Sequence, residues 1–152
     1  MSLRFVWTDG ENEDFRHFWL VTEQYYSALV GGEENRKQFI PYNLSSAVED
    51  VLLVYEEDRA VACSGLKKYS VSDAEIKRVW VDPAYRSRHI ATMMMVKIEE
   101  RAKVRGFRRT ILQTREIMKD AVGLYTRLGY HLIANYPPYD KLEGAICFAK
   151  VL

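Results

Sequence analysis

The sequence predicts a mixed α/β fold in which helices flank one central sheet. Amphipathic stretches at helical spacing alternate along the chain with short runs of β-branched and aromatic residues. Paired strand candidates stand toward both ends, and the 152 residues contain no repeat and no low-complexity linker. These features favour a single domain over residues 1–152 built on a mixed sheet. Residues 1–3 could be a cloning leader and carry no weight in this prediction.

The first half of the chain is expected to supply two helices and four strands. Apolar residues recur at helical spacing from Asp14 to Val30, and Gly31-Gly32 is expected to end this helix. The charged run at residues 56–59 suits a tight turn between two strands. In order, the predicted elements are a strand at residues 4–8, a helix at 14–30, a weaker helix at 34–39, and strands at 51–55, 60–69 and 74–81.

The second half is expected to contain two helices that each end at a glycine. The longer helix stops at Gly106, and the shorter one, which stops at Gly129, has an apolar stripe at i, i+3, i+4 and i+7. In order, the predicted elements are a helix at residues 88–105, a strand at 110–114, a helix at 121–128, and strands at 130–134 and 145–151.

Composition excludes several classes of protein. Apolar residues make up 48% and charged residues 28%, and no run approaches the roughly 20 apolar residues of a membrane span. The N-terminus lacks the apolar segment of a signal peptide, so a cytoplasmic protein without a membrane partner is expected. Cys63 and Cys147 are isolated, and with three scattered histidines they predict neither a disulfide nor a metal site.

Charge is distributed unevenly although the net charge is only +1. Residues 1–60 carry twelve acidic and five basic side chains, whereas residues 86–109 carry eight basic and two acidic ones. The basic stretch could be a solvated helix face or the surface for a polyanionic ligand. A strand ending at Val81 runs through a turn into the long helix, and a helix N-terminus offers backbone N–H groups to phosphate. This arrangement favours the anion site, while the net charge argues against nucleic acid as a partner.

Two segments resemble the signatures of the GNAT superfamily of N-acetyltransferases, in the family's order and at its usual separation. Residues 74–91 (AEIKRVWVDPAYRSRHIA) resemble its acetyl-CoA-binding core, and residues 121–130 (AVGLYTRLGY) resemble its second signature. The C-terminal segments at residues 136–139 (YPPY) and 146–150 (ICFAK) are similar to those of small, single-domain bacterial members. The resemblance implies a central, mostly antiparallel mixed sheet in the order β-α-α-β-β-β-α-β-α-β-β. It also implies direct transfer of an acetyl group from acetyl-CoA, as co-substrate, to a primary amine, without a metal.

The resemblance also implies which residues contact the co-substrate. In the family's Gln/Arg-x-x-Gly-x-Gly/Ala loop, Arg86, Ile90 and Ala91 match, whereas His89 replaces one glycine and Ser87 stands where a second is common. Met118 stands where an asparagine is frequent. These departures are expected to weaken CoA binding without abolishing it. The implied contacts are Val79, Trp80, Val81, Arg86, Ser87, Arg88, His89, Ile90, Ala91, Thr92, Met118 and Tyr125.

Two side chains are candidates for the chemistry. The resemblance places Tyr125 beside the CoA sulfur as the acid that protonates the leaving thiolate, although a core tyrosine on an apolar helix stripe would have the same pattern. Glu75 precedes Arg86 by eleven residues, the spacing of the base carboxylate in histone-acetylating relatives. It is predicted to be the base or to position a water, with a surface or strand-end glutamate as the alternative. Strict alternation would place Glu75, Lys77, Val79 and Val81 on one strand face.

The acceptor is expected to be an undefined amine that lies against Tyr26, Tyr42 and Tyr139. Aromatic side chains near an acidic N-terminal half suit a cationic amine or a peptide N-terminus, although Tyr25 and Tyr26 could equally be core residues. A CoA-binding sensor without catalysis is the alternative function, favoured by His89 and Met118 and opposed by Tyr125 and Glu75. An RNA-directed acetyltransferase would need a basic acceptor face, which the acidic first 60 residues oppose. A homodimer is left open.

Overall fold

The computed structural model describes residues 2–29 and 45–152. The predicted helix at residues 34–39 and the end of the first helix at Gly31-Gly32 lie outside these ranges. The described elements agree in type and order with the remaining predictions. They are β1 (Leu3–Thr8), α1 (Glu13–Leu29), β2 (Asp50–Glu56), β3 (Arg59–Lys68), β4 (Asp73–Val81), α2 (Ile90–Val104), β5 (Arg109–Arg115), α3 (Lys119–Arg127), β6 (His131–Ile133) and β7 (Ala145–Val151).

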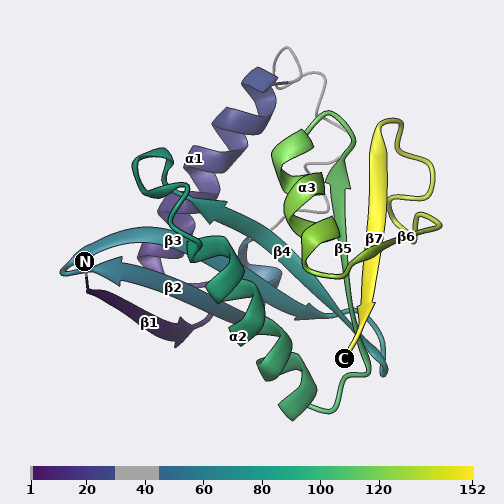
Figure 1. Cartoon of the computed structure of the whole chain (residues 1–152), viewed down its shortest axis with the longest axis horizontal. Helices are drawn as coiled ribbons and strands as arrows, with labels where there is room; N and C mark the ends of the chain where they lie inside the picture. The colour runs from purple at the N-terminus through teal and green to yellow at the C-terminus, as the bar shows by residue number, and fades with distance from the viewer. Residues whose placement is uncertain (1, 30–44) are drawn as a thin grey trace.

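The seven described strands form one twisted sheet in the order β1-β2-β3-β4-β5-β7-β6 (Figure 1). Every neighbouring pair is antiparallel except β4 and β5, which are parallel. The predicted mixed, mostly antiparallel sheet is therefore confirmed. Leu3, one of the three residues considered as a possible cloning leader, pairs with Glu56 in the first ladder. Leu3 is therefore part of the sheet.

Helix α1 covers one face of the sheet. Asn12 caps it, because its side-chain oxygen accepts the N–H groups of Asp14 and Phe15, at 2.8 and 3.1 Å. The acidic residues of its first turn also suit the positive end of the helix dipole. The buried side chains of α1 pack on β2, β3 and β4. This cluster consists of Phe15, Phe18, Trp19, Val48, Val51, Leu53, Cys63 and Trp80.

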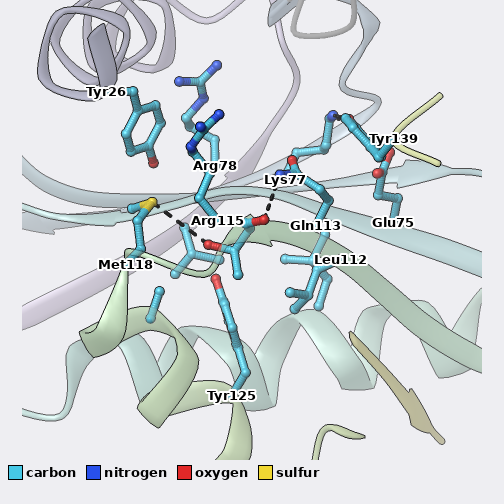
Figure 2. A pocket seen from close by; sticks show the side chains of 14 residues that line it. Tyr26, Glu75, Lys77, Arg78, Leu112, Gln113, Arg115, Met118, Tyr125 and Tyr139 are labelled. Atoms are coloured by element: carbon cyan, nitrogen blue, oxygen red, sulfur yellow. Dashed lines mark hydrogen bonds and ion pairs between the residues drawn. The ribbon is translucent and has the colours of Figure 1, made fainter. Parts of the chain in front are cut away.

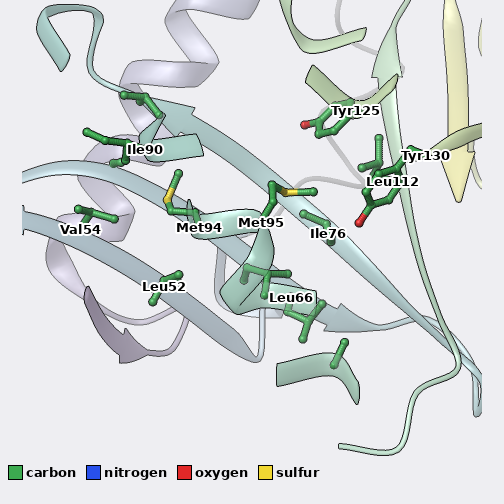
Figure 3. Close-up of a cluster of buried hydrophobic side chains, with 14 of the residues drawn as sticks. Leu52, Val54, Leu66, Ile76, Ile90, Met94, Met95, Leu112, Tyr125 and Tyr130 are labelled. Atoms are coloured by element: carbon green, nitrogen blue, oxygen red, sulfur yellow. The ribbon is translucent and has the colours of Figure 1, made fainter. Parts of the chain in front are cut away.

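Helices α2 and α3 lie on the other face, where the larger core forms (Figure 3). In α2 the residues Ile90, Met94, Ile98 and Ala102 repeat every four positions and are buried against the strands. Full burial of each large apolar side chain contributes roughly 1.5–3 kcal/mol, so α2 is firmly anchored. Tyr125 of α3 joins the same core. None of the described helices has the length and apolar character needed to cross a bilayer.

A bulge interrupts β4 and corrects the predicted alternation. Cys63 pairs with Trp80 and Gly65 with Lys77, so two residues of β4 oppose the single Ser64. Arg78, at the bulge, has φ of 57°. As a result Lys77 and Arg78 project to the α1 side of the sheet, and Val79 and Val81 turn to the α2 side. The expectation that Val79 and Val81 share a face with Glu75 is wrong.

Strands β4 and β5 separate soon after they meet. Their parallel pairing covers only Asp73–Glu75 and Arg109–Ile111. Beyond these residues the backbones diverge, because β4 is bulged and no further ladder joins the two strands. The divergence opens the middle of the sheet between α1 and α3, and the candidate site lies there (Figure 1).

Candidate active site

A cavity of about 110 Å³, the β4–β5 cavity, occupies the gap between the two diverging strands. Its walls are residues 76–79 of β4 and residues 112–115 of β5, closed by Glu75 and by side chains from three other segments. Those side chains are Tyr26, Met118, Ala121, Tyr125 and Tyr139. Tyr125 and Glu75, the two predicted catalytic residues, therefore line one cavity although 50 positions separate them in the sequence.

A second cavity of about 390 Å³, the α1–α3 cavity, extends from this point toward the start of α2. It lies between α1 and α3, with residues 79–81 of β4 as its floor and Arg86 and Ala91 at its far end. Seven residues predicted to contact the co-substrate line it. They are Val79, Trp80, Val81, Arg86, Ala91, Met118 and Tyr125.

The two cavities meet at a junction formed by Tyr26, Val79, Met118, Ala121 and Tyr125, which line both. Figure 2 shows the Tyr26 and Tyr125 hydroxyls pointing toward the middle of the cavity from opposite sides. Tyr26 comes from α1 and Tyr125 from α3. A group that extends along the α1–α3 cavity would thus end between two phenol hydroxyls, facing the β4–β5 cavity.

The turn before α2 has the geometry of an anion site. Ser87 and His89 have φ of 64° and 62°, the left-handed conformation in which glycine is favoured. The N–H of Met93 makes the first helical bond, to His89 O at 3.1 Å, and the N–H groups just before it lie at the positive helix end. Arg86 Nε donates to Val81 O at 3.0 Å, which fixes the turn against β4. Ser87, Arg88 and His89 are exposed.

The model of the acetyltransferase (GNAT) family matches residues 5–130, which is most of the chain. The chain belongs to the GNAT family. A curated relative, "Probable N-acetyltransferase 14" of Xenopus tropicalis, is 31% identical over 109 residues, covering 71% of this chain and 53% of that protein. The chain spans about half the length of the curated relatives it matches.

Solved GNAT structures share the whole fold. The PaiA N-acetyltransferase of Thermoplasma acidophilum, solved with coenzyme A, is 15% identical with a TM-score of 0.76, and each chain is covered fully. A GNAT acetyltransferase of Staphylococcus aureus Mu50 is 16% identical with a TM-score of 0.74, covering 99% of both chains. At these identities the likeness establishes the GNAT fold.

Tyr125 is buried at the junction of the two cavities. Its side chain is 7% exposed, and its ring contacts the rings of Tyr130 and Phe148. Burial, with a smaller contribution from Tyr26, raises the pKa of its phenol above the ordinary value. Tyr125 is therefore both a core residue and a protonated group directed into the site.

Glu75 is buried at the far end of the β4–β5 cavity, with 5% of its surface exposed. Its Oε2 accepts a hydrogen bond of 2.6 Å from the Tyr136 hydroxyl, and its Oε1 lies 3.8 Å from Lys77 Nζ. Lys77 Nζ in turn donates to the Tyr139 hydroxyl at 2.6 Å. Burial and the neighbouring Glu75 charge raise the pKa of Tyr136, so it remains a neutral donor to the carboxylate. The alternative of a surface glutamate is wrong.

The remaining predicted residues take several positions. Tyr26 and Tyr139 line the β4–β5 cavity, and Tyr42 lies outside the described residues. Ser87, Arg88, His89 and Thr92 lie at the turn and first turn of α2, whereas the Ile90 side chain is directed into the core.

The basic stretch at residues 86–109 was expected to form the surface for the anion, but several of its arginines lie far from the turn before α2. Arg101 and Arg105 lie at the opposite end of α2, about 20 Å from its N-terminus, where both contact Asp50. Arg109 pairs with Asp73 at 2.9 Å. These three arginines join α2 and β5 to the sheet, so only Arg86 and Arg88 of the stretch stand at the turn itself.

Sequence reasoning missed three cavity residues. Lys77, Arg78 and Arg115 line the β4–β5 cavity. Lys77 and Arg78 belong to the segment at residues 74–91 but were given no role at the site, and Arg115 lies outside both segments. Arg78 is held by Glu23 at 2.7 Å and by Thr22 at 2.9 Å, with its guanidinium 3.8 Å from the centre of the Trp19 ring. Tyr136 was missed as well, because its contact with Glu75 spans 61 positions and left no sequence signal.

Proposed function

We propose that this GNAT protein transfers an acetyl group from acetyl-CoA to a primary amine, directly, in a complex that holds both substrates. The observation that carries the proposal is the junction of the two cavities at Tyr125. One cavity leads from the anion turn of α2, and the other contains a buried carboxylate. A donor and an acceptor could thus approach the junction from different sides, which a direct transfer requires.

The residues present fit acetyl-CoA. Backbone N–H groups at the start of α2 suit the pyrophosphate, with Arg86 and Arg88 beside them. The α1–α3 cavity leads from this turn to the junction, and its volume of about 390 Å³ falls in the range of small-ligand sites. Coenzyme A is present in the PaiA structure that shares this fold. Bound there, acetyl-CoA would supply the activated acetyl group as a thioester.

In this proposal Tyr125 donates a proton to the departing sulfur. An aliphatic thiolate leaves more readily when it is protonated, and a neutral phenol is a suitable donor. A phenol of ordinary pKa already carries its proton at neutral pH, and burial of Tyr125, which raises this pKa, further disfavours the free phenolate. The backbone of residues 79–81, which forms the floor of the cavity, orients the pantetheine arm and the thioester carbonyl.

Glu75 accepts the proton that the acceptor must lose. An alkylammonium group has a pKa near 10.4 and cannot attack a thioester until it is deprotonated. Glu75 is the single carboxylate among the described lining residues of the β4–β5 cavity. Tyr136 and Lys77 hold it in place. It acts on the amine directly or through one water.

The experiment that tests this function is a screen of primary amines with acetyl-CoA. Purified protein should release CoA thiol in a time-dependent way and form an N-acetyl product that mass spectrometry detects. A non-catalytic CoA-binding module would bind acetyl-CoA without releasing thiol, even by slow hydrolysis. If acetyl-CoA binds but no thiol is released with amines of different size and charge, the protein is a CoA-binding sensor and not a transferase.

A further inference from the structure

The lining of the β4–β5 cavity has a polar side and an apolar side. The polar side carries Glu75 together with other charged and amide side chains of β4 and β5. The apolar side faces α2 and α3, because its residues belong to the larger core or pack against it. They are Ile76, Val79, Leu112, Ala121 and Tyr125. An amine and an apolar acyl chain would therefore meet different walls of the same cavity.

Met118 stands at the edge of the apolar side, where the two cavities meet. Its backbone is fixed at the start of α3, because its C=O accepts the N–H of Val122 at 3.1 Å. Its thioether accepts a hydrogen bond from the Thr114 hydroxyl, with 3.8 Å between Oγ1 and Sδ. Figure 2 shows the Met118 side chain between those of Tyr26 and Tyr125, which line the same junction. The thioether is thus held at the entrance to the β4–β5 cavity.

The space beyond this entrance is small. The β4–β5 cavity has a volume of about 110 Å³, well below the roughly 300–1,000 Å³ of ordinary small-molecule sites. Ile76 and Leu112 are almost completely buried, and close packing of the core keeps them from moving aside. Met118 is half-buried, and its unbranched side chain fills space that a larger ligand would need. A chain longer than acetyl would have to displace the thioether.

We propose that Met118 restricts the acyl group of the donor to acetyl. The inference rests on the proposed acetyl transfer and specifies its donor. With the thioester sulfur beside Tyr125, the acyl chain extends past the junction toward Ile76 and Leu112. The Met118 thioether occupies the room that further methylenes require. Longer acyl-CoA molecules therefore bind more weakly and place the thioester carbonyl away from the acceptor amine.

A series of donors with one acceptor tests the proposal. Acetyl-CoA, propionyl-CoA and butyryl-CoA have thioesters of similar intrinsic reactivity, so kcat/KM with the best amine of the screen reports how well the acyl chain fits. A single methylene in an apolar pocket changes kcat/KM by about 10-fold to 200-fold. We expect kcat/KM to fall by about tenfold or more from acetyl-CoA to butyryl-CoA, with propionyl-CoA between them.

Variants assign the preference to Met118. Met118→Ala removes the side chain beyond Cβ and should raise kcat/KM for butyryl-CoA relative to acetyl-CoA by about tenfold or more. Met118→Leu nearly conserves the volume and should keep the preference. Met93→Ala makes the same truncation at an exposed position of α2 and should leave the donor series unchanged. Melting curves show which variants are folded, and Met118→Val, a smaller truncation, replaces an alanine variant that does not fold.

Binding without reaction gives a second measurement. In the absence of an amine, calorimetry compares the Kd of acetyl-CoA with that of butyryl-CoA. The longer chain adds apolar surface, which favours butyryl-CoA where nothing obstructs it. We expect the wild type to bind butyryl-CoA more weakly than acetyl-CoA, and Met118→Ala to remove this difference.

The outcomes distinguish this inference from the proposed function. A wild type that uses butyryl-CoA as well as acetyl-CoA, or a Met118→Ala variant that keeps the wild-type preference, overturns the role of Met118 and leaves the transferase intact. If acetyl-CoA binds but no amine reacts, the Kd values decide, and a ratio that Met118→Ala does not change again overturns the inference. A protein that neither binds acetyl-CoA nor releases thiol refutes the transferase itself, and the inference with it.

Discussion

Tyr125 belongs to the core and also lines the candidate site, two positions that its place on an apolar helix stripe seemed to make exclusive. Its ring belongs to the core with Tyr130 and Phe148, and its hydroxyl reaches the junction of the two cavities. Ring packing fixes the oxygen, because a buried aromatic side chain has few alternative rotamers. The same burial that stabilises the fold keeps the phenol protonated. At the scale of this residue, packing of the ring positions the hydroxyl that we propose as the acid.

Tyr125→Phe isolates the hydroxyl from the ring. We expect kcat to fall about 10-fold to 10³-fold with acetyl-CoA affinity nearly unchanged, because the proton matters mainly in the transition state. The free energy of unfolding should fall by about 1 kcal/mol at most. Steady-state kinetics and urea denaturation measure the two effects. The loss in kcat should shrink for a thioester of a more acidic thiol; an equal loss for good and poor leaving groups would indicate a misplaced donor and remove the acid role.

Glu75→Gln tests the proposed base. The amide has nearly the same shape and can still accept from Tyr136, but it cannot take a proton. We expect kcat to fall by roughly 10²-fold or more at neutral pH with little change in acetyl-CoA affinity. Near-normal turnover in this variant would make Glu75 a structural partner of Tyr136 and Lys77.

Tyr136→Phe is the matched test of a positioning residue. The carboxylate stays, but it loses the 2.6 Å hydrogen bond that holds it in place. We therefore expect kcat to fall by about tenfold, less than in Glu75→Gln, with KM for acetyl-CoA unchanged, because the base is present but misplaced. A normal kcat together with a lower melting temperature would assign Tyr136 to packing alone.

At the scale of elements, the turn into α2 uses backbone conformations that family members provide with glycine. Ser87 and His89 both take positive φ, which costs a residue with a Cβ about 1–2 kcal/mol. The burial of α2 offsets this free-energy cost. Four side chains anchor the helix just beyond the turn: Ile90, Met94, Ile98 and Ala102. The backbone N–H groups keep their direction whatever side chain stands at these positions.

His89→Gly and His89→Ala measure that cost as a pair. Both remove the exposed imidazole, but only alanine retains the Cβ in the left-handed region. The glycine variant should be more stable than the alanine variant by about 1 kcal/mol in urea denaturation, the reverse of the usual order. It should also bind CoA more tightly in calorimetry, because no β-carbon then narrows the approach of the pyrophosphate. Tighter binding by the alanine variant would contradict this account.

At the scale of the whole molecule, α1, β4, the start of α2 and α3 converge on one continuous space. Each contributes lining residues to the α1–α3 cavity, so a ligand there would connect elements from both faces of the sheet. Binding to the folded state alone stabilises it by about 2.7 kcal/mol at a hundredfold excess over Kd. Such a ligand couples the turn of α2 to the rest of the fold.

Acetyl-CoA should therefore raise the melting temperature in a dose-dependent way. At a hundredfold excess over Kd we expect a rise of about 5–10 °C for a chain of this size, measured by differential scanning calorimetry. Adenosine without phosphates serves as the control and should produce a much smaller rise. A melting curve that neither acetyl-CoA nor CoA moves would refute the assignment of the α1–α3 cavity to the co-substrate.

The sequence by itself determined the type and order of the elements that the structure describes, because periodicity, glycine stops and the segments at residues 74–91 and 121–130 are local signals. Tertiary structure decided what those signals cannot encode. The bulge at Arg78 arises where β4 must pair with β3 and yet leave β5, and it reverses the side-chain faces beyond it. The contacts that build the site, Glu75 with Tyr136 and Lys77 with Tyr139, span about sixty positions. Burial at such contacts depends on the packed chain, so the surroundings of Glu75 and Lys77 emerged only in the fold.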